Sequence, residues 1–396
     1  MADEPAGGGE AARASLASGG ASGTASGLAS GGASGSRAAS PRSSAASPAG
    51  SGREGAGSSC AGGPSGATGA ASPPEQGGRA GGELEDPWNL ARMAMGSLAG
   101  EPWRLKQALA DPPKAFELCP VPDFGSWWDQ FQKTQTYDDF KSRLVRSDFT
   151  NRTIDVIIVG EPKAVRDRVH FPTVLTHIEA FTGYTVALRP VEVRLGDWAC
   201  PRKAADDRDQ VAAHLVLGQL EDMADPRSVC TIGLTGMDLY LPKGNHSHVA
   251  GASDSHHRVG IFSIARYSVH LGYNPLIDMK EAMSTCLVKV LCRECLKLCG
   301  MGECRLLRCL MNPCSGGRPE AVNALPLSLC CICLRKLHWL SQVDLLDRYA
   351  HLPRVLSDWF EEETEWLKQR MVQVGMPTYG SLQTPKLPEP DPGKFL

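Results

Sequence analysis

Residues 293–304 read RECLKLCGMGEC, and residues 330–337 read CCICLRKL. The first stretch closes an apolar run over residues 276–299, whose spacing predicts a long helix. Gly300 follows that helix, where a glycine is expected because the chain often leaves a helix with a positive φ. The second stretch leads into a further predicted helix over residues 334–349. The two stretches therefore predict two helices joined by a cysteine-rich loop.

Cysteines concentrate in this part of the sequence, since 10 of the 14 lie within residues 286–333. In a chain without a secretory signal, such clustering indicates metal binding more often than disulfides. Cys304 and Cys309 come just after the long helix, and the C-x-x-C pair of Cys330 and Cys333 comes just before the next one. Four thiolates from two such pairs suit a tetrahedral zinc, with Zn–S distances of about 2.3 Å. We predict a structural zinc held by these four cysteines.

Other interpretations of the cysteines remain open. Buried thiols also pack as small core residues, and Cys314 or Cys331 is an alternative ligand. Cys292, Cys295 and Cys299 are spaced i, i+3, i+7 on one face of the predicted helix. That spacing favours core packing over metal binding.

Upstream of the motif, four short apolar stretches rich in β-branched residues predict strands. They are residues 154–159, 184–193, 229–234 and 259–265. Helical patterns over residues 171–181 and 207–223 lie between them, and this order predicts a mostly parallel sheet with right-handed crossovers. Residues 101–145 predict short helices, and residues 352–371 predict a last helix. The predicted fold is α/β, with a four-stranded mixed sheet, helices, a cysteine-rich zinc loop and C-terminal helices.

The two ends of the chain differ in composition from the middle. Of residues 1–85, 59 are Gly, Ala or Ser and none is Phe, Trp or Tyr, so this segment is predicted to be a disordered tail. Residues 376–396 are rich in proline and predict a second flexible tail. A single folded domain is predicted over residues 86–375.

Composition and charge argue against several classes of protein. The 41 Lys and Arg nearly balance the 44 Asp and Glu, for a net charge of −3, which argues against a nucleic-acid binder. No run of about 18 uncharged apolar residues occurs, so no membrane-spanning helix is expected. Residues 11–50 carry arginines like a transit peptide, but the acids and glycines around them oppose organellar targeting. We expect an intracellular protein, cytoplasmic or nuclear.

The motif stretches resemble the archaemetzincins, zinc-metalloprotease-like proteins with the pattern H-E-x-x-H-x-x-G-x-x-H-C-x4-C-x-M, followed by C-x-x-C-L-x-K-L. The resemblance covers about residues 125–350. It extends to three strand segments, residues 233–235, 238–240 and 263–267. It implies a metzincin-like fold, Glu294 at the general-base position and Met311 as the Met-turn methionine. It also implies that the four cysteines named above are structural-zinc ligands.

The three catalytic-zinc positions of that pattern hold Arg293, Lys297 and Glu303 instead of histidines. Arginine offers a metal no lone pair, and lysine must first lose a proton against a reference pKa of about 10.4. One carboxylate does not replace three ligands. We therefore predict a degraded catalytic site, in which Arg293 and Lys297 face Glu294 and Glu303 as a buried ion cluster. The alternative is four charges exposed to solvent.

A histidine-rich segment between the third and fourth predicted strands departs from the family. It contains His246, His248, His256 and His257. Two histidine pairs are suited to binding a transition metal, but the glycines and serines around them predict a flexible loop.

These observations favour a non-catalytic pseudoprotease with one structural zinc and a cleft that binds an extended peptide or protein. The alternative is an active zinc-dependent metallopeptidase that hydrolyses peptide bonds with unconventional metal ligands. A third interpretation is a zinc-stabilised scaffold that recruits partners through its N-terminal tail.

Overall fold

The computed structural model describes residues 86–119, 126–143, 152–242, 247–271, 278–314 and 318–377. The predicted tail of residues 1–85 and residues 378–396 of the second tail lie outside the described residues. Within the described ranges, no helix combines the length and the apolar character needed to span a bilayer.

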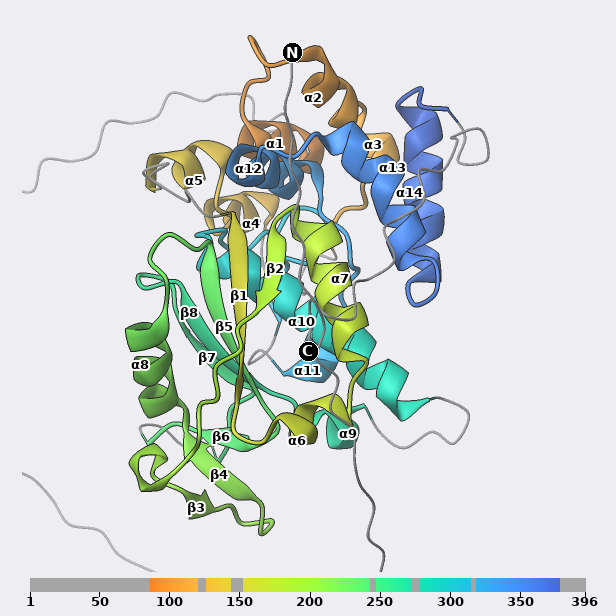
Figure 1. The fold of residues 1–396 in the computed structure, drawn as a ribbon. Coiled ribbons are helices and arrows are strands. Elements are labelled where there is room, and N and C mark those ends of the chain that lie inside the picture. Colours follow the sequence, from red (N-terminus) through yellow and green to blue (C-terminus); the bar gives the residue numbers. More distant parts are fainter. Residues whose placement is uncertain are drawn as a thin grey trace, which may run out of the picture. The chain divides into compact units, whose positions relative to one another are not determined.

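The centre of the fold is a five-stranded mixed sheet of order β2-β1-β5-β8-β7 (Figure 1). Its parallel strands are β1 (Thr153–Val159), β2 (Thr185–Leu188), β5 (Cys230–Thr235) and β8 (Val259–Ser263). They correspond to the four strands predicted from the sequence, so the α/β class and the mixed sheet are confirmed. The predicted number of strands is wrong, because β7 (Gly251–Asp254) adds an antiparallel fifth strand beside β8.

Strand β7 lies in the segment that its glycines and serines predict to be a flexible loop, and that prediction is wrong. Gly251 pairs with Phe262 of β8. A Cβ atom at Gly251 would collide with the Phe262 ring, so this glycine is needed for the close approach of two strands rather than for flexibility.

Substituting Gly251 therefore tests the importance of this strand pair. We expect Gly251→Val to destabilise the protein by about 1–3 kcal/mol, because the added side chain overlaps the Phe262 ring. Ser253 lies two residues further along β7 with an exposed side chain, and we expect Ser253→Val to change stability by less than about 0.5 kcal/mol. Urea unfolding measured by circular dichroism compares the two, and equal midpoints would contradict the strand assignment.

A second, three-stranded sheet of order β3-β4-β6 lies near the end of the first. It consists of β3 (Arg202–Lys203), β4 (Asp209–Ala212) and β6 (Asp238–Tyr240). The helix predicted over residues 207–223 therefore begins later, as α8 (Ala213–Met223). Parallel pairing with β6 keeps residues 209–212 extended.

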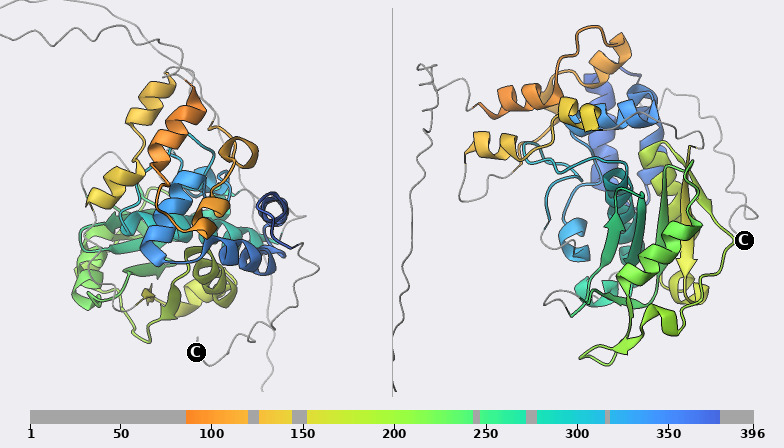
Figure 2. Two further views of the ribbon diagram at one scale, coloured as in Figure 1. Left: turned by 90° about the horizontal axis from the view of Figure 1, so that it is seen from above. Right: turned by 90° about the vertical axis from the view of Figure 1, so that its left-hand side faces the viewer.

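Helices cover both faces of the large sheet (Figures 1 and 2). Alternate residues of β1 point to opposite faces. Ile154, Val156 and Ile158 pack with α7 (Phe171–Thr182) and α10 (Met279–Leu298), whereas Ile157 and Val159 pack with α8. Both α7 and α10 match the predicted helices within a few residues. The glycines after them have positive φ, 74° at Gly183 and 86° at Gly300, as expected for the ends of helices.

The C-terminal helices are α12 (Cys331–Ser341), α13 (Leu345–Leu356) and α14 (Glu361–Gln373). The sequence predicted two helices here, over residues 334–349 and 352–371, and the predicted boundary between them is wrong. The break falls at Gln342, which has a φ of 56°, and Asp344 then caps α13 by accepting bonds from the amides of Leu346 and Asp347 at 2.9 and 3.1 Å.

Short helices make up the N-terminal part, as predicted. They are α1 (Pro87–Met95), α2 (Trp103–Ala108), α3 (Pro112–Ala115), α4 (Trp127–Gln132) and α5 (Tyr137–Arg143). Buried arginines of the C-terminal helices hold them in place. Arg335 of α12 donates to the carbonyls of Met95 and Ser97 at 2.6 and 2.8 Å, and Arg370 of α14 donates to that of Ala108 at 2.9 Å. The remaining helices are the short α6 (Pro162–Arg166), η1 (Asp197–Ala199), α9 (Tyr267–His270) and α11 (Pro319–Asn323).

Candidate metal centre and adjoining ion cluster

Three of the predicted zinc ligands converge at the junction of α10 and α12. The ligand atoms of Cys304, Cys330 and Cys333 all lie within 4.8 Å of one another, and the Sγ atoms of Cys304 and Cys330 are 3.6 Å apart. Cys304 lies in the loop after α10, Cys330 caps α12, and Cys333 lies in its first turn. In the part of the chain that the structure describes, this is the one group of three or more Cys, His, Asp or Glu side chains with such a spacing.

Cys309 neighbours Cys304 but lies outside the group of three thiols whose ligand atoms are all within 4.8 Å of one another. Hydrogen bonds from the Cys309, Cys330 and Cys333 thiols lower the pKa of the Cys304 thiol well below its usual range. Thiolate is the form of cysteine that binds zinc, and four neighbouring thiols match a tetrahedral structural site. The residues therefore fit a structural zinc, which would cross-link the loop after α10 to the start of α12. The role of each cysteine as a ligand stays a prediction.

A buried asparagine that the sequence analysis did not single out shapes this loop. The side chain of Asn312 donates to the carbonyls of Cys304 and Leu307 at 2.6 and 2.8 Å and accepts from the amide of Cys309 at 2.8 Å. These bonds fix the backbone around two of the thiols. In the sequence, the only sign of this role is that Asn312 directly follows Met311, and that position alone does not indicate a loop-binding side chain.

The alternative ligands and the helix-face cysteines lie outside the three-thiol group. Cys331 lies outside the three-thiol group, and burial raises the pKa of its thiol to about 12. Cys314 is half-buried and is also outside that group. The helix-face set of Cys292, Cys295 and Cys299 is buried in the core, as predicted.

A cluster of three charges occupies the helix that carries the rest of the motif. Arg293 Nη1 lies 2.9 Å from Glu294 Oε1, and Lys297 Nζ lies 3.2 and 2.9 Å from the two carboxylate oxygens of Glu294. Arg293 is only 3% exposed and also donates to the carbonyl of Asn312 at 3.2 Å. We call Arg293, Glu294 and Lys297 the ion cluster. The solvated alternative is wrong for Arg293 and Glu294, which are both buried.

Glu303 does not join the ion cluster, so the predicted fourth member is wrong. Its Oε2 lies 2.7 Å from Arg305 Nη2, a cation only two residues away. Gln135 binds the same loop, through the carbonyl of Gly300 at 3.0 Å and the amide of Gly302 at 2.7 Å. Glu303 is therefore engaged by its own loop rather than by Arg293 or Lys297.

A catalytic zinc does not fit this arrangement. Two of its three expected ligand positions carry cations, which have no lone pair to offer at neutral pH. The carboxylate of Glu294 is bound by both of them, and Glu303 is paired with Arg305. Met311, expected as the Met-turn residue, is buried in the loop beside Asn312.

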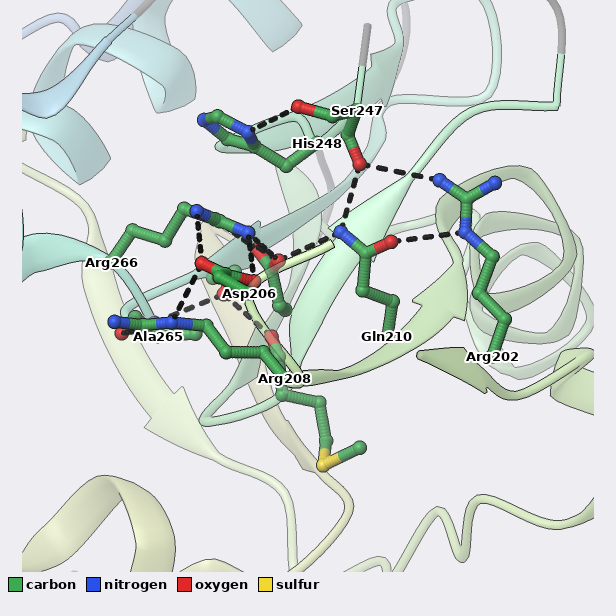
Figure 3. A network of polar contacts seen from close by, with 11 residues as sticks. Arg202, Asp206, Arg208, Gln210, Ser247, His248, Ala265 and Arg266 are labelled. Atoms are coloured by element: carbon green, nitrogen blue, oxygen red, sulfur yellow. Dashed lines mark hydrogen bonds and ion pairs between the residues drawn. The ribbon is translucent and has the colours of Figure 1, made fainter. Parts of the chain in front are cut away.

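The histidines do not supply replacement ligands among the described residues. His246 lies outside the described residues. His257 holds Glu221 and Asp254 with its two ring nitrogens, each at 3.1 Å, and His256 packs edge-on against it with ring centroids 4.7 Å apart. The His248 ring bonds the Ser247 hydroxyl at 3.1 Å (Figure 3).

His248 lies at the border of a polar network that joins the small sheet to the end of β8 (Figure 3). Arg266, just after β8, binds Asp206 at 3.0 Å and the buried Asp238 at 2.6 Å. Gln210 of β4 donates to Asp238 at 2.7 Å and to the carbonyl of Ser247 at 2.9 Å. The sequence segments around Asp238 and Arg266 thus meet in space. Both side chains find their hydrogen-bond and ion-pair partners within the protein.

Known proteins are similar in sequence to nearly half of this chain. Archaemetzincin-1 of Rattus norvegicus is 32% identical over 199 residues, which are 43% of this chain and 39% of that protein. Archaemetzincin-2 of Homo sapiens is 28% identical over 218 residues, 46% of this chain and 59% of that protein. The chain thus spans about two fifths of the length of Archaemetzincin-1. No family model matches the chain.

Among solved structures, an archaemetzincin from Methanopyrus kandleri has 23% identity and a TM-score of 0.34, covering 47% of this chain and 96% of its own. An archaemetzincin from Archaeoglobus fulgidus has 18% identity and a TM-score of 0.34, covering 46% and 99%. The curated relatives confirm the resemblance inferred from the motif: over nearly half of its length, this chain is similar in sequence to the archaemetzincins.

Proposed function

We propose that this protein is a non-catalytic member of the archaemetzincin group that binds an extended peptide and uses zinc only for structure. The observation that carries the proposal is the ion cluster, in which Arg293 and Lys297 both bind the carboxylate of Glu294. A zinc peptidase needs three protein ligands for its metal and a carboxylate able to take a proton from water. Here two of the three ligand positions hold cations, and both cations bind the carboxylate of Glu294.

The open edge of the large sheet supports peptide binding. In an antiparallel pair, alternate residues direct both backbone groups toward the neighbouring strand. The carbonyl of Ala250 accepts from the amide of Ser263 at 2.9 Å, whereas the amide of Val249 donates away from β8 to Leu239, also at 2.9 Å. Gly251 and Ser253 are two and four residues after Val249. Because the direction alternates along the strand, their backbone N–H and C=O groups also point away from β8. No strand of the described residues pairs with them on that side.

An extended peptide can therefore add to β7 as a sixth strand, held by backbone hydrogen bonds. Ser253 gives a direct test. We expect Ser253→Pro to reduce the affinity for bound peptides at least about tenfold, because proline removes an outward amide without removing a β7–β8 bond. Ser253→Ala keeps that amide and is expected to bind like the original chain. Peptides selected by phage display on the full chain provide the probes, and titration calorimetry measures them.

Equal binding by the proline and alanine variants would place the peptide elsewhere. Failure to select any peptide would count against the peptide-binding function itself.

The absence of catalysis has its own test. We expect the full chain, purified with zinc, to contain one zinc per chain and to release it only on thiol modification or unfolding. Incubation with a complex peptide mixture is expected to generate no new peptide termini by mass spectrometry. Cleavage that a mild chelator abolishes, together with a second zinc, would instead support the alternative function, a metallopeptidase with unconventional ligands.

A further inference from the structure

A pocket of about 310 Å³ opens where α3, α11 and α14 meet. That volume is at the lower end of the range of small-ligand sites. None of its lining residues belongs to the ion cluster, to the thiol group or to β7, so it is independent of the proposed function.

One wall of the pocket is a fixed aromatic surface. Trp366 of α14 donates its ring N–H to the carbonyl of Ala115 at 3.1 Å. The ring of Phe116 packs against it with centroids 5.9 Å apart, and Tyr349 meets it edge-on at 6.4 Å. These contacts hold the indole ring in one orientation, with part of its surface on the pocket.

Three carboxylates line the pocket, and two of them lie near a cation. Lys289 binds the carbonyl of Asn323 at 3.0 Å and lies 3.7 Å from Glu363, and Arg308 pairs with Glu117 at 2.9 Å.

The third carboxylate, Glu362, forms no ion pair with any described residue. The pocket therefore carries two cations and three carboxylates, a net charge of −1. Glu362 precedes Trp366 by four residues on α14, so both lie on the same face of that helix.

We propose that this pocket binds a basic side chain of a peptide, with its cationic group between the Glu362 carboxylate and the Trp366 ring. A lysine ammonium or an arginine guanidinium gains both a charge-assisted hydrogen bond and a cation–π contact there. The fixed indole adds no ordering cost on binding. An acidic side chain would instead meet the Glu362 carboxylate in a pocket with a net charge of −1, which discriminates against it.

Fluorine NMR of the full chain labelled with 5-fluorotryptophan tests the proposal. Trp366→Phe assigns the Trp366 resonance among those of the eight tryptophans. We expect N-acetyl-arginine methylamide and N-acetyl-lysine methylamide to shift this resonance saturably. N-acetyl-citrulline methylamide has nearly the shape of the arginine probe without its charge, and is expected to leave the resonance unchanged.

A pair of matched variants adds a second readout. We expect Glu362→Gln to weaken binding of the arginine probe about three- to tenfold. Glu365→Gln, on the same helix but outside the pocket and within 3.8 Å of Lys368, is expected to have no effect. Both side chains are exposed, so neither change threatens folding. An equal shift with the citrulline probe, no saturable shift with the basic probes, or equal affinities of the two variants would overturn the proposal.

Discussion

Replacing Cys333 with alanine is expected to abolish zinc retention and to lower the thermal midpoint by roughly 10–20 °C. Cys333 lies within 4.8 Å of two other buried thiols, and this group joins the loop after α10 to the start of α12. A structural zinc contributes its binding free energy to folding, so loss of a ligand costs several kcal/mol, and each kcal/mol shifts the midpoint of a domain of this size by about 2–4 °C. Zinc is measured by mass spectrometry, and unfolding by calorimetry.

Cys331 provides the matched control, because it lies on the same helix and is also buried, but outside the three-thiol group. We expect Cys331→Ala to keep one zinc per chain and to cost about 1 kcal/mol, the loss of a small buried group. Zinc retained by the Cys333 variant would contradict the predicted ligand set. Zinc lost by both variants would mean that the site needs the whole start of α12 rather than one thiol.

The parts of the fold that the sequence predicted well are those with local causes. Strands β1, β5 and β8 are short runs of mostly apolar, buried residues. Helices α7 and α10 are each followed by a glycine whose positive φ few other residues adopt comfortably. Strand β7 escaped prediction because its glycine serves a contact with Phe262, a partner 11 residues away that no local pattern names. Strand β4 escaped it because pairing with β6, 28 residues further on, overrides the helical pattern of residues 209–212.

In the candidate site, too, the contacts between residues close in sequence were predicted better than those set by the path of the chain. Spacing within one helix turn places Cys330 and Cys333 close together, whereas Cys304, 26 residues before Cys330, meets them through the tertiary fold. The helix likewise places Lys297 within reach of Glu294, three residues before it. Glu303 was assigned wrongly because its partner is decided by the path of the loop after Gly300, where Arg305 lies nearer than either cation of α10.

Replacing Glu294 with alanine is expected to destabilise the protein by about 3–5 kcal/mol. Glu294 is the carboxylate that pairs with both Arg293 and Lys297. The Arg293 side chain is 3% exposed, and its Nε atom has no hydrogen-bond partner, so without Glu294 a buried guanidinium would lose its counter-charge. Removing one partner of a buried pair costs this much because the other charge is left uncompensated.

Glu303→Ala is the matched control for this prediction. Its ion pair with Arg305 is 42% and 29% exposed, so we expect a loss of less than about 1 kcal/mol. Urea unfolding of the two variants compares them directly, and equal losses would contradict a buried ion cluster. A triple variant, Arg293→Met, Glu294→Gln and Lys297→Met, leaves no charge unpaired and is expected to be far more stable than Glu294→Ala alone. That outcome would mean that the loss in Glu294→Ala comes from leaving buried charge without a partner.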